Sequence, residues 1–156
     1  MAAYTPRMHQ ATIKRATARD AAALTGLVRE SGAYRGPYSS IISGYRVTAD
    51  YIARHRVFTA VDATDRLLGF YALVLDPPEL DLAFVSDDAQ GAGVGRLLIG
   101  HMLAQAAEAG LSTVRVVSHP PAEAFYRRLG ARRTGTVPPR PPQVTWARPE
   151  LHFAVG

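Results

Sequence analysis

The sequence predicts an α/β fold of the α+β type, with one mixed sheet packed against helices. Its 156 residues fit a single domain over 1–156, and 47% of them are apolar, enough for a buried core. In some segments apolar residues recur at every second position, as in strands, and in others about every 3.6 positions, as in helices. The two kinds of segment alternate along the chain. In the middle, two apolar runs joined by Asp76-Pro77-Pro78 predict an antiparallel hairpin, because proline cannot join a central ladder.

Seven strands and four helices are expected. Apolar runs predict strands at Ala11–Ala16, Val57–Val61, Leu67–Leu75, Leu80–Val85, Leu111–Val117, Ala131–Val137 and Val144–Val155. Helical spacing predicts helices at Ala21–Glu30, Thr48–His55, Gly93–Ala109 and Pro120–Leu129. Thr17 and Thr48 suit the N-caps of the first two helices, and Gly110 and Gly130 stop the last two.

Composition narrows the function classes. The chain has no cysteine, which excludes disulfides, thiolate nucleophiles and Cys-ligated metal centres. The five histidines show no metal-ligand spacing, so no metal is expected. No apolar run approaches the ~20 residues that span a bilayer, and the N-terminus lacks a signal-peptide core. We therefore expect a cytoplasmic protein with no membrane partner.

The net charge of +5 lies in the last third of the chain. Residues 1–109 carry 11 basic and 11 acidic side chains, whereas residues 110–156 carry seven arginines and two glutamates. A localised excess of positive charge implies an anionic partner, either nucleic acid or a phosphorylated cofactor. The sequence has no recognised nucleic-acid-binding motif, so no nucleic acid is expected and the cofactor is favoured.

The segment Ser86–Leu98, SDDAQGAGVGRLL, places Gly91, Gly93 and Gly95 between a strand and a helix. Glycine allows a sharp turn and a close approach of a ligand to backbone amides. The first helical turn adds unpaired N–H groups and the positive end of the dipole, which together suit phosphates. The dinucleotide fingerprint would need glycine where Arg96 stands, and the P-loop pattern also fails.

The spacing that fits is Gln90-x-x-Gly93-x-Gly95. It resembles the Q/R-x-x-G-x-G/A signature of the GCN5-related N-acetyltransferases, the GNAT superfamily. The stretch from Phe125-Tyr126 to Gly130-Ala131 resembles the family's F-Y-x-x-x-G-F. The resemblance implies a mixed, mostly antiparallel seven-stranded sheet with about four helices, splayed between strands four and five.

The resemblance also implies acetyl-coenzyme A as cosubstrate and no metal. The backbone of Phe84 and Val85 would bind the pantetheine arm, and the Val85 N–H would polarise the thioester carbonyl. Ser118, with His119, stands where the family often has asparagine, and Ser118 could replace that contact. The remaining cofactor-binding residues implied are Gln90, Gly91, Ala92, Gly93, Val94, Gly95, Arg96 and Phe125.

Direct attack of an amine on the thioester calls for an acid and a base. Tyr126 resembles the family's tyrosine that protonates the departing thiolate, with core packing as the alternative. Glu79 and Asp81 are two residues apart on a strand and so face one side. Glu79 is our choice of base because it lies near the strand's start, with a solvated strand end as the alternative. His119 is the competing base.

The acceptor is expected to be a primary amine of a small molecule or a peptide. The loop Gly32–Arg46 carries three tyrosines and two arginines, which suit a small amine with an anionic group or, equally, a surface loop. Trp146 and the proline segment could line the acceptor site or form a homodimer contact. The rival function is a non-catalytic acyl-coenzyme A sensor or interaction module.

Overall fold

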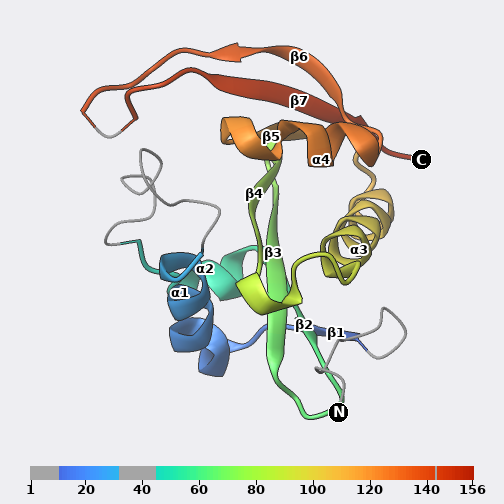
Figure 1. Ribbon diagram of the computed structural model, residues 1–156. Helices are drawn as coiled ribbons and strands as arrows, with labels where there is room; N and C mark the ends of the chain where they lie inside the picture. Colours follow the sequence, from blue (N-terminus) through green and yellow to red (C-terminus); the bar gives the residue numbers. More distant parts are fainter. Residues whose placement is uncertain (1–10, 32–44, 143) are drawn as a thin grey trace.

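The computed structural model describes residues 11–31, 45–142 and 144–156, and its strands form one seven-stranded sheet (Figure 1). The strands are β1 (Thr12–Arg15), β2 (Arg56–Val61), β3 (Leu67–Leu75), β4 (Pro78–Val85), β5 (Thr113–Val117), β6 (Arg132–Val137) and β7 (Arg148–Ala154). Their order is β1-β2-β3-β4-β5-β7-β6, and all pairs are antiparallel except the parallel pair β4–β5. The predicted mixed, mostly antiparallel sheet is confirmed.

Four α-helices cover the sheet from both sides (Figure 1). They are α1 (Ala21–Arg29), α2 (Ala49–Arg54), α3 (Val94–Glu108) and α4 (Glu123–Arg128), and 3-10 turns cover Ala18–Asp20, Asp87–Ala89 and Pro120–Ala122. The predicted cap at Thr48 forms, since its hydroxyl accepts from the Tyr51 N–H at 3.1 Å. Thr17 instead precedes the 3-10 turn Ala18–Asp20, where its N–H donates to the Asp20 carboxylate at 2.7 Å, and Asp20 is the N-cap of α1. None of these helices is long and apolar enough to cross a membrane.

Strand β3 is buried on both faces. Phe70 and Ala72 pack in the core under α1 and α2, while Tyr71 and Leu73 pack in the core under α3 and α4. A strand covered on both sides needs apolar residues at every position. This is why Leu67–Leu75 shows a continuous apolar run instead of an alternation.

The sheet opens between β4 and β5. These strands pair at one position, where Glu79 lies opposite Arg115, whereas β4 pairs with β3 along its whole length. A bulge interrupts the β3–β4 pairing, because Leu80 and Leu82 face consecutive residues of β3 and Asp81 is the extra residue. The expected splay between the fourth and fifth strands is therefore present, and the bulge lies beside its closed end.

Two predicted boundaries were wrong. The strand predicted over Val144–Val155 begins only at Arg148, because the backbone of Val144 bonds to Arg140 at 2.7 and 3.0 Å and closes a loop. Pro78 was assigned to the hairpin turn but is the first residue of β4, a position where a missing N–H costs no ladder bond.

Gly69 on β3 has no room for a side chain. A Cβ there would lie 2.6 Å from the Phe84 carbonyl oxygen and 3.1 Å from Leu98 Cδ1. Because the closest atom is backbone, we expect Gly69→Ala to lower the free energy of unfolding by about 1–3 kcal/mol. The control is Gly100→Ala on α3, where nothing lies within 4 Å. It should raise stability by about 0.5–1 kcal/mol. Urea unfolding of both variants measures the difference, and equal stabilities would contradict the close approach.

Candidate active site

The three glycines of the loop before α3 have two different structural roles. Gly91 and Gly93 have φ of 80° and 84°, in the left-handed region that favours glycine, and Gly93 is the N-cap of α3. Gly95 lies inside the helix, where a Cβ would come within 2.9 Å of Phe125 Cζ. Two glycines thus form the turn, and the third lets the Phe125 ring of α4 pack against α3.

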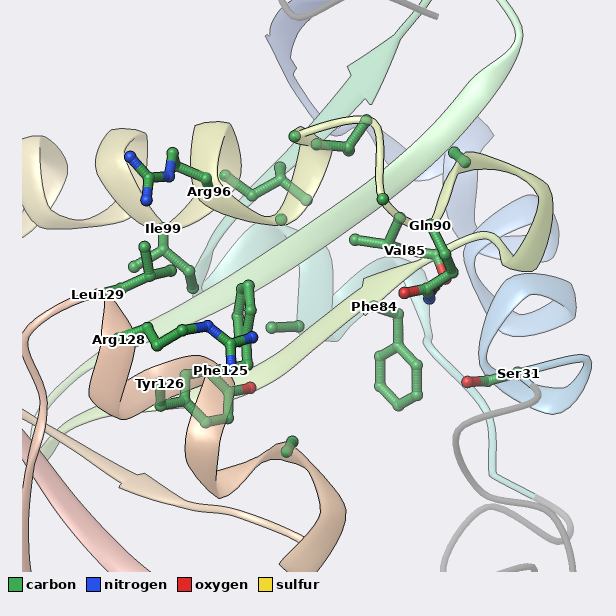
Figure 2. A pocket seen from close by; sticks show the side chains of 18 of the residues that line it. Ser31, Phe84, Val85, Gln90, Arg96, Ile99, Phe125, Tyr126, Arg128 and Leu129 are labelled. Carbon is green, nitrogen blue, oxygen red and sulfur yellow. Dashed lines mark hydrogen bonds between the residues drawn. The ribbon is translucent and has the colours of Figure 1, made fainter. Parts of the chain in front are cut away.

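A cavity of about 530 Å³ lies between this loop, β4 and α4 (Figure 2). It falls within the ~300–1,000 Å³ typical of small-molecule and cofactor sites. The predicted cofactor-binding residues that line it are Phe84, Val85, Gln90, Gly91, Gly93, Val94, Gly95, Arg96 and Phe125. Of the other two, Ala92 packs against the adjacent core and Ser118 lines a second cavity. The structure therefore gathers most of the predicted set around one cavity.

Positive charge flanks this first cavity. Arg96 on α3 and Arg128 on α4 are both exposed and both line it (Figure 2). Arg128 was not among the predicted site residues, although the arginine-rich stretch after Tyr126 was a signal for it. Gln90 Nε2 donates to the Val85 carbonyl at 3.0 Å, so the Gln90 side chain ties the loop to the end of β4.

A second cavity of about 150 Å³ lies in the opening between β4 and β5. Its lining includes β4 from Leu80 to Phe84, the end of β5, and side chains from outside these strands such as Tyr45 and Arg148. Four residues line both cavities: Ala83, Phe84, His119 and Tyr126. The Tyr126 hydroxyl points into the space between α4 and β4 (Figure 2), and the side chain is only 8% exposed. The two cavities therefore meet at Tyr126 and His119.

Arg115 on β5 bonds one carboxylate from each neighbouring strand, at the closed end of the opening. Its Nε donates to Glu150 at 2.5 Å and its Nη1 donates to Glu79 at 3.2 Å. Burial raises the pKa of Glu79 above its ordinary value, the charge of Arg115 opposes this rise, and the charge of Asp81 adds to it. Glu79 lines neither cavity but lies close enough to Asp81 for their charges to interact.

Asp81, the extra residue of the bulge, lines the second cavity and accepts a short hydrogen bond from the Tyr51 hydroxyl of α2. Burial, with the Asp81 charge, raises the pKa of Tyr51, so this phenol stays protonated and donates. Burial raises the pKa of Tyr45 to about 12, and Asp81 again contributes. The sequence predicted that Asp81 and Glu79 face the same side of a strand. No pattern in it indicated that the Tyr51 hydroxyl would donate a hydrogen bond to Asp81.

The remaining predicted residues lie at the end of β5. Ser118 and His119 are buried, and the Ser118 hydroxyl donates to the His119 carbonyl at 2.6 Å. Of the tyrosine loop Gly32–Arg46, only Tyr45 and Arg46 belong to the described residues. His101 lies away from both cavities, 2.7 Å from the Tyr71 hydroxyl and packed on Phe58. In the described ranges, no group of three or more His, Asp or Glu side chains could hold a metal ion.

A family model described as an acetyltransferase (GNAT) domain matches residues 10–138. This match covers well over half of the chain, so the protein belongs to the GNAT acetyltransferase family. The matched range contains the glycine loop, the β4 residues that line both cavities, the β5 residues that line the second, and Tyr126.

Two curated relatives are similar in sequence. The chain is 30% identical to the peptidyl-lysine N-acetyltransferase YjaB of Salmonella typhimurium over an aligned stretch of 105 residues, and this stretch is 67% of the chain. It is 34% identical over 79 residues to the protein of the same name from Escherichia coli, which covers 51% of this chain. The chain spans less than two thirds of these relatives, 66% and 51% of their lengths.

Solved structures share the fold at low identity. A GCN5-related N-acetyltransferase from Rhodopseudomonas palustris superposes with a TM-score of 0.76 at 19% identity, over 99% of each chain. A phosphinothricin acetyltransferase from Sinorhizobium meliloti, solved in complex with acetyl-coenzyme A, gives 0.71 at 19% identity, over 94% of this chain and 89% of that one. At this identity the likeness shows the fold alone.

The contact between Gly95 and Phe125 makes a prediction for coenzyme A binding. Gly95→Ala adds a Cβ that displaces the Phe125 ring, which lines the first cavity. We expect the affinity for coenzyme A to fall about tenfold, equivalent to ~1.4 kcal/mol, when measured by calorimetry. Gly100→Ala, on the same helix and free of contacts, should bind as the wild type does. Equal affinities in all three proteins would show that Phe125 does not shape the cofactor cavity.

Proposed function

We propose that this protein transfers the acetyl group of acetyl-coenzyme A to a primary amine of a small molecule or peptide, in the bacterial cytoplasm. The observation that carries the proposal is that two cavities meet at Tyr126, one beside the glycine loop and one in the sheet opening. A donor entering from one side and an amine from the other would meet there. The family supports the donor, and the relatives named as lysine acetyltransferases support an amine acceptor.

The residues that line the first cavity suit the binding of acetyl-coenzyme A, the proposed acetyl donor. Gly95 leaves a space that the Phe125 ring fills, and the amides from Gly91 to Arg96 lie at the start of a 15-residue helix. That helix end favours phosphates through its N–H groups and its dipole, and Arg96 and Arg128 add charge. Phe84 and Val85, on the β4 edge that β5 leaves unpaired, can offer backbone groups to an extended pantetheine arm.

The proposed reaction needs three proton transfers besides the acyl transfer. The ammonium of the acceptor first loses a proton to a base, and its neutral nitrogen then attacks the thioester carbonyl carbon. As the carbon–sulfur bond breaks, Tyr126 gives its proton to the thiolate. The second proton of the nitrogen restores the phenol, and the products are an N-acetylated amine and the free thiol.

Two residues compete for the role of base. Glu79 remains our first choice because its raised pKa gives it more affinity for a proton than an ordinary glutamate has. Since it lines neither cavity, it would act through an intervening water. His119 lines both cavities and would act directly. A non-catalytic acyl-coenzyme A sensor would need the glycine loop but not Tyr126 at the junction, and we therefore favour an enzyme.

The proton donor can be tested by removing one hydroxyl. Tyr126→Phe keeps the ring that packs against Phe125 and Phe153. We expect its single-turnover acetyl-transfer rate to fall by roughly 10²–10⁴-fold with nearly unchanged affinity for acetyl-coenzyme A. The matched control is Tyr71→Phe, which removes a buried hydroxyl that bonds His101 outside both cavities. It should keep the wild-type rate. A normal rate in Tyr126→Phe would assign that tyrosine to packing.

The base can be identified from pH profiles. A free alkyl ammonium has a pKa near ~10, so near pH 7 it must lose a proton before attack. Glu79→Gln should therefore lower kcat/KM at neutral pH, with partial recovery at high pH where the amine arrives deprotonated. His119→Gln, measured in parallel, should show that behaviour instead if His119 is the base. Unchanged profiles in both variants would mean that bulk water takes the proton.

A further inference from the structure

Arg148, the first residue of β7, has no ion-pair partner in the part of the chain that the structure describes. It lines the second cavity, its Nε is inaccessible to solvent, and this Nε has no hydrogen-bond partner among the described residues. All thirteen acidic side chains of the sequence lie in the described ranges, and no ion pair there includes Arg148. An uncompensated, partly buried guanidinium is costly, and a bound anion would remove that cost.

Arg115, the arginine that pairs opposite Glu79, is not available to bind an anion. Arg115 lies at the closed end of the opening, and it already bonds Glu79 and Glu150. The positive charge of Arg148 also lowers the pKa of Glu79, but by less than the charge of Arg115 does. Of the two arginines, Arg148 alone lines the second cavity and lacks a carboxylate partner.

The same cavity contains one carboxylate. Asp81 comes from β4, on the other side of β5 from β7, and the Tyr51 hydroxyl holds it in place. Tyr45 adds a largely apolar, partly buried ring. Among the described lining residues the cavity therefore presents one positive and one negative group, contributed by strands on opposite sides of β5.

We propose that the acceptor is a small amino acid, whose carboxylate pairs with Arg148 and whose ammonium pairs with Asp81. This inference rests on the proposed function, since it concerns the acceptor of the same reaction. An arginine can bind a carboxylate through two parallel hydrogen bonds, which would also orient the amine. The 150 Å³ that the described residues enclose is smaller than the ~300 Å³ at which drug-sized sites begin, so a compact molecule fits better than a large one.

The test measures binding of acceptors to the protein saturated with coenzyme A. The twenty common amino acids are screened by calorimetry, and each that binds is compared with its carboxamide and its decarboxylated amine. We expect at least one amino acid to bind, and both analogues to bind roughly 10- to 100-fold more weakly, because each has lost a hydrogen bond to a charged group.

Variants assign this preference to Arg148. Arg148→Met should weaken amino-acid binding by roughly the same 10- to 100-fold and bring the acid and its carboxamide to equal affinity. Arg148→Lys should keep part of the preference. Arg132→Met removes an exposed arginine of β6 that lines neither cavity, and it should behave as the wild type. The affinity for coenzyme A should be the same in all four proteins.

Three results would overturn the inference. They are binding of no amino acid, equal affinity of the wild type for acid and carboxamide, and an equal loss of affinity for both in Arg148→Met. The first two compare ligands on the wild-type protein, so they hold even if a variant fails to fold. Failure of the proposed function looks different: coenzyme A would not bind, or no amine, including a lysine-containing peptide, would release the thiol from acetyl-coenzyme A.

Discussion

The single contact between β4 and β5 is the constraint on which the site depends. Strand β4 is fully paired to β3, and it meets β5 only where Glu79 lies opposite Arg115. Parallel strands that part after one position leave backbone groups and side-chain space between them. The second cavity occupies that space, and the first cavity continues from it along the far end of β4. A sheet paired along its full length would have neither the cavity in the opening nor its junction with the other.

The closed end of this opening is held by charge and by backbone geometry together. Arg115 links β4 to β7 through Glu79 and Glu150, so the three strands around the opening are tied by one guanidinium. The bulge at Asp81 lies beside this tie and turns a carboxylate toward Tyr51. Bulges commonly re-aim side chains next to active sites, and here the re-aimed side chain lines the smaller cavity.

Local patterns in the sequence determined most of the fold and the residues gathered around the first cavity. The glycine spacing before α3 and the Phe125-Tyr126 pair both act within a few residues, through turn geometry and helix ends, and such features can be read without tertiary contacts. The continuous apolar run of Leu67–Leu75 likewise predicted a strand, and its burial on both faces explains that run. Strand ends were less predictable, since Arg140 closes a loop with Val144 through backbone bonds that no side-chain pattern specifies.

Only the tertiary structure decided which residues line the second cavity. Tyr51, Asp81 and Arg148 come from a helix and two strands that are far apart in the sequence, and no local spacing relates them. Whether an arginine forms an ion pair also depends on folding. No sequence pattern distinguishes Arg115 from Arg148, but only Arg115 forms ion pairs with carboxylates. The sequence by itself determined that the chain forms a glycine turn ahead of a helix, because that depends on backbone conformation. The charges that line the second cavity depend on which strands become neighbours, and the fold alone sets that.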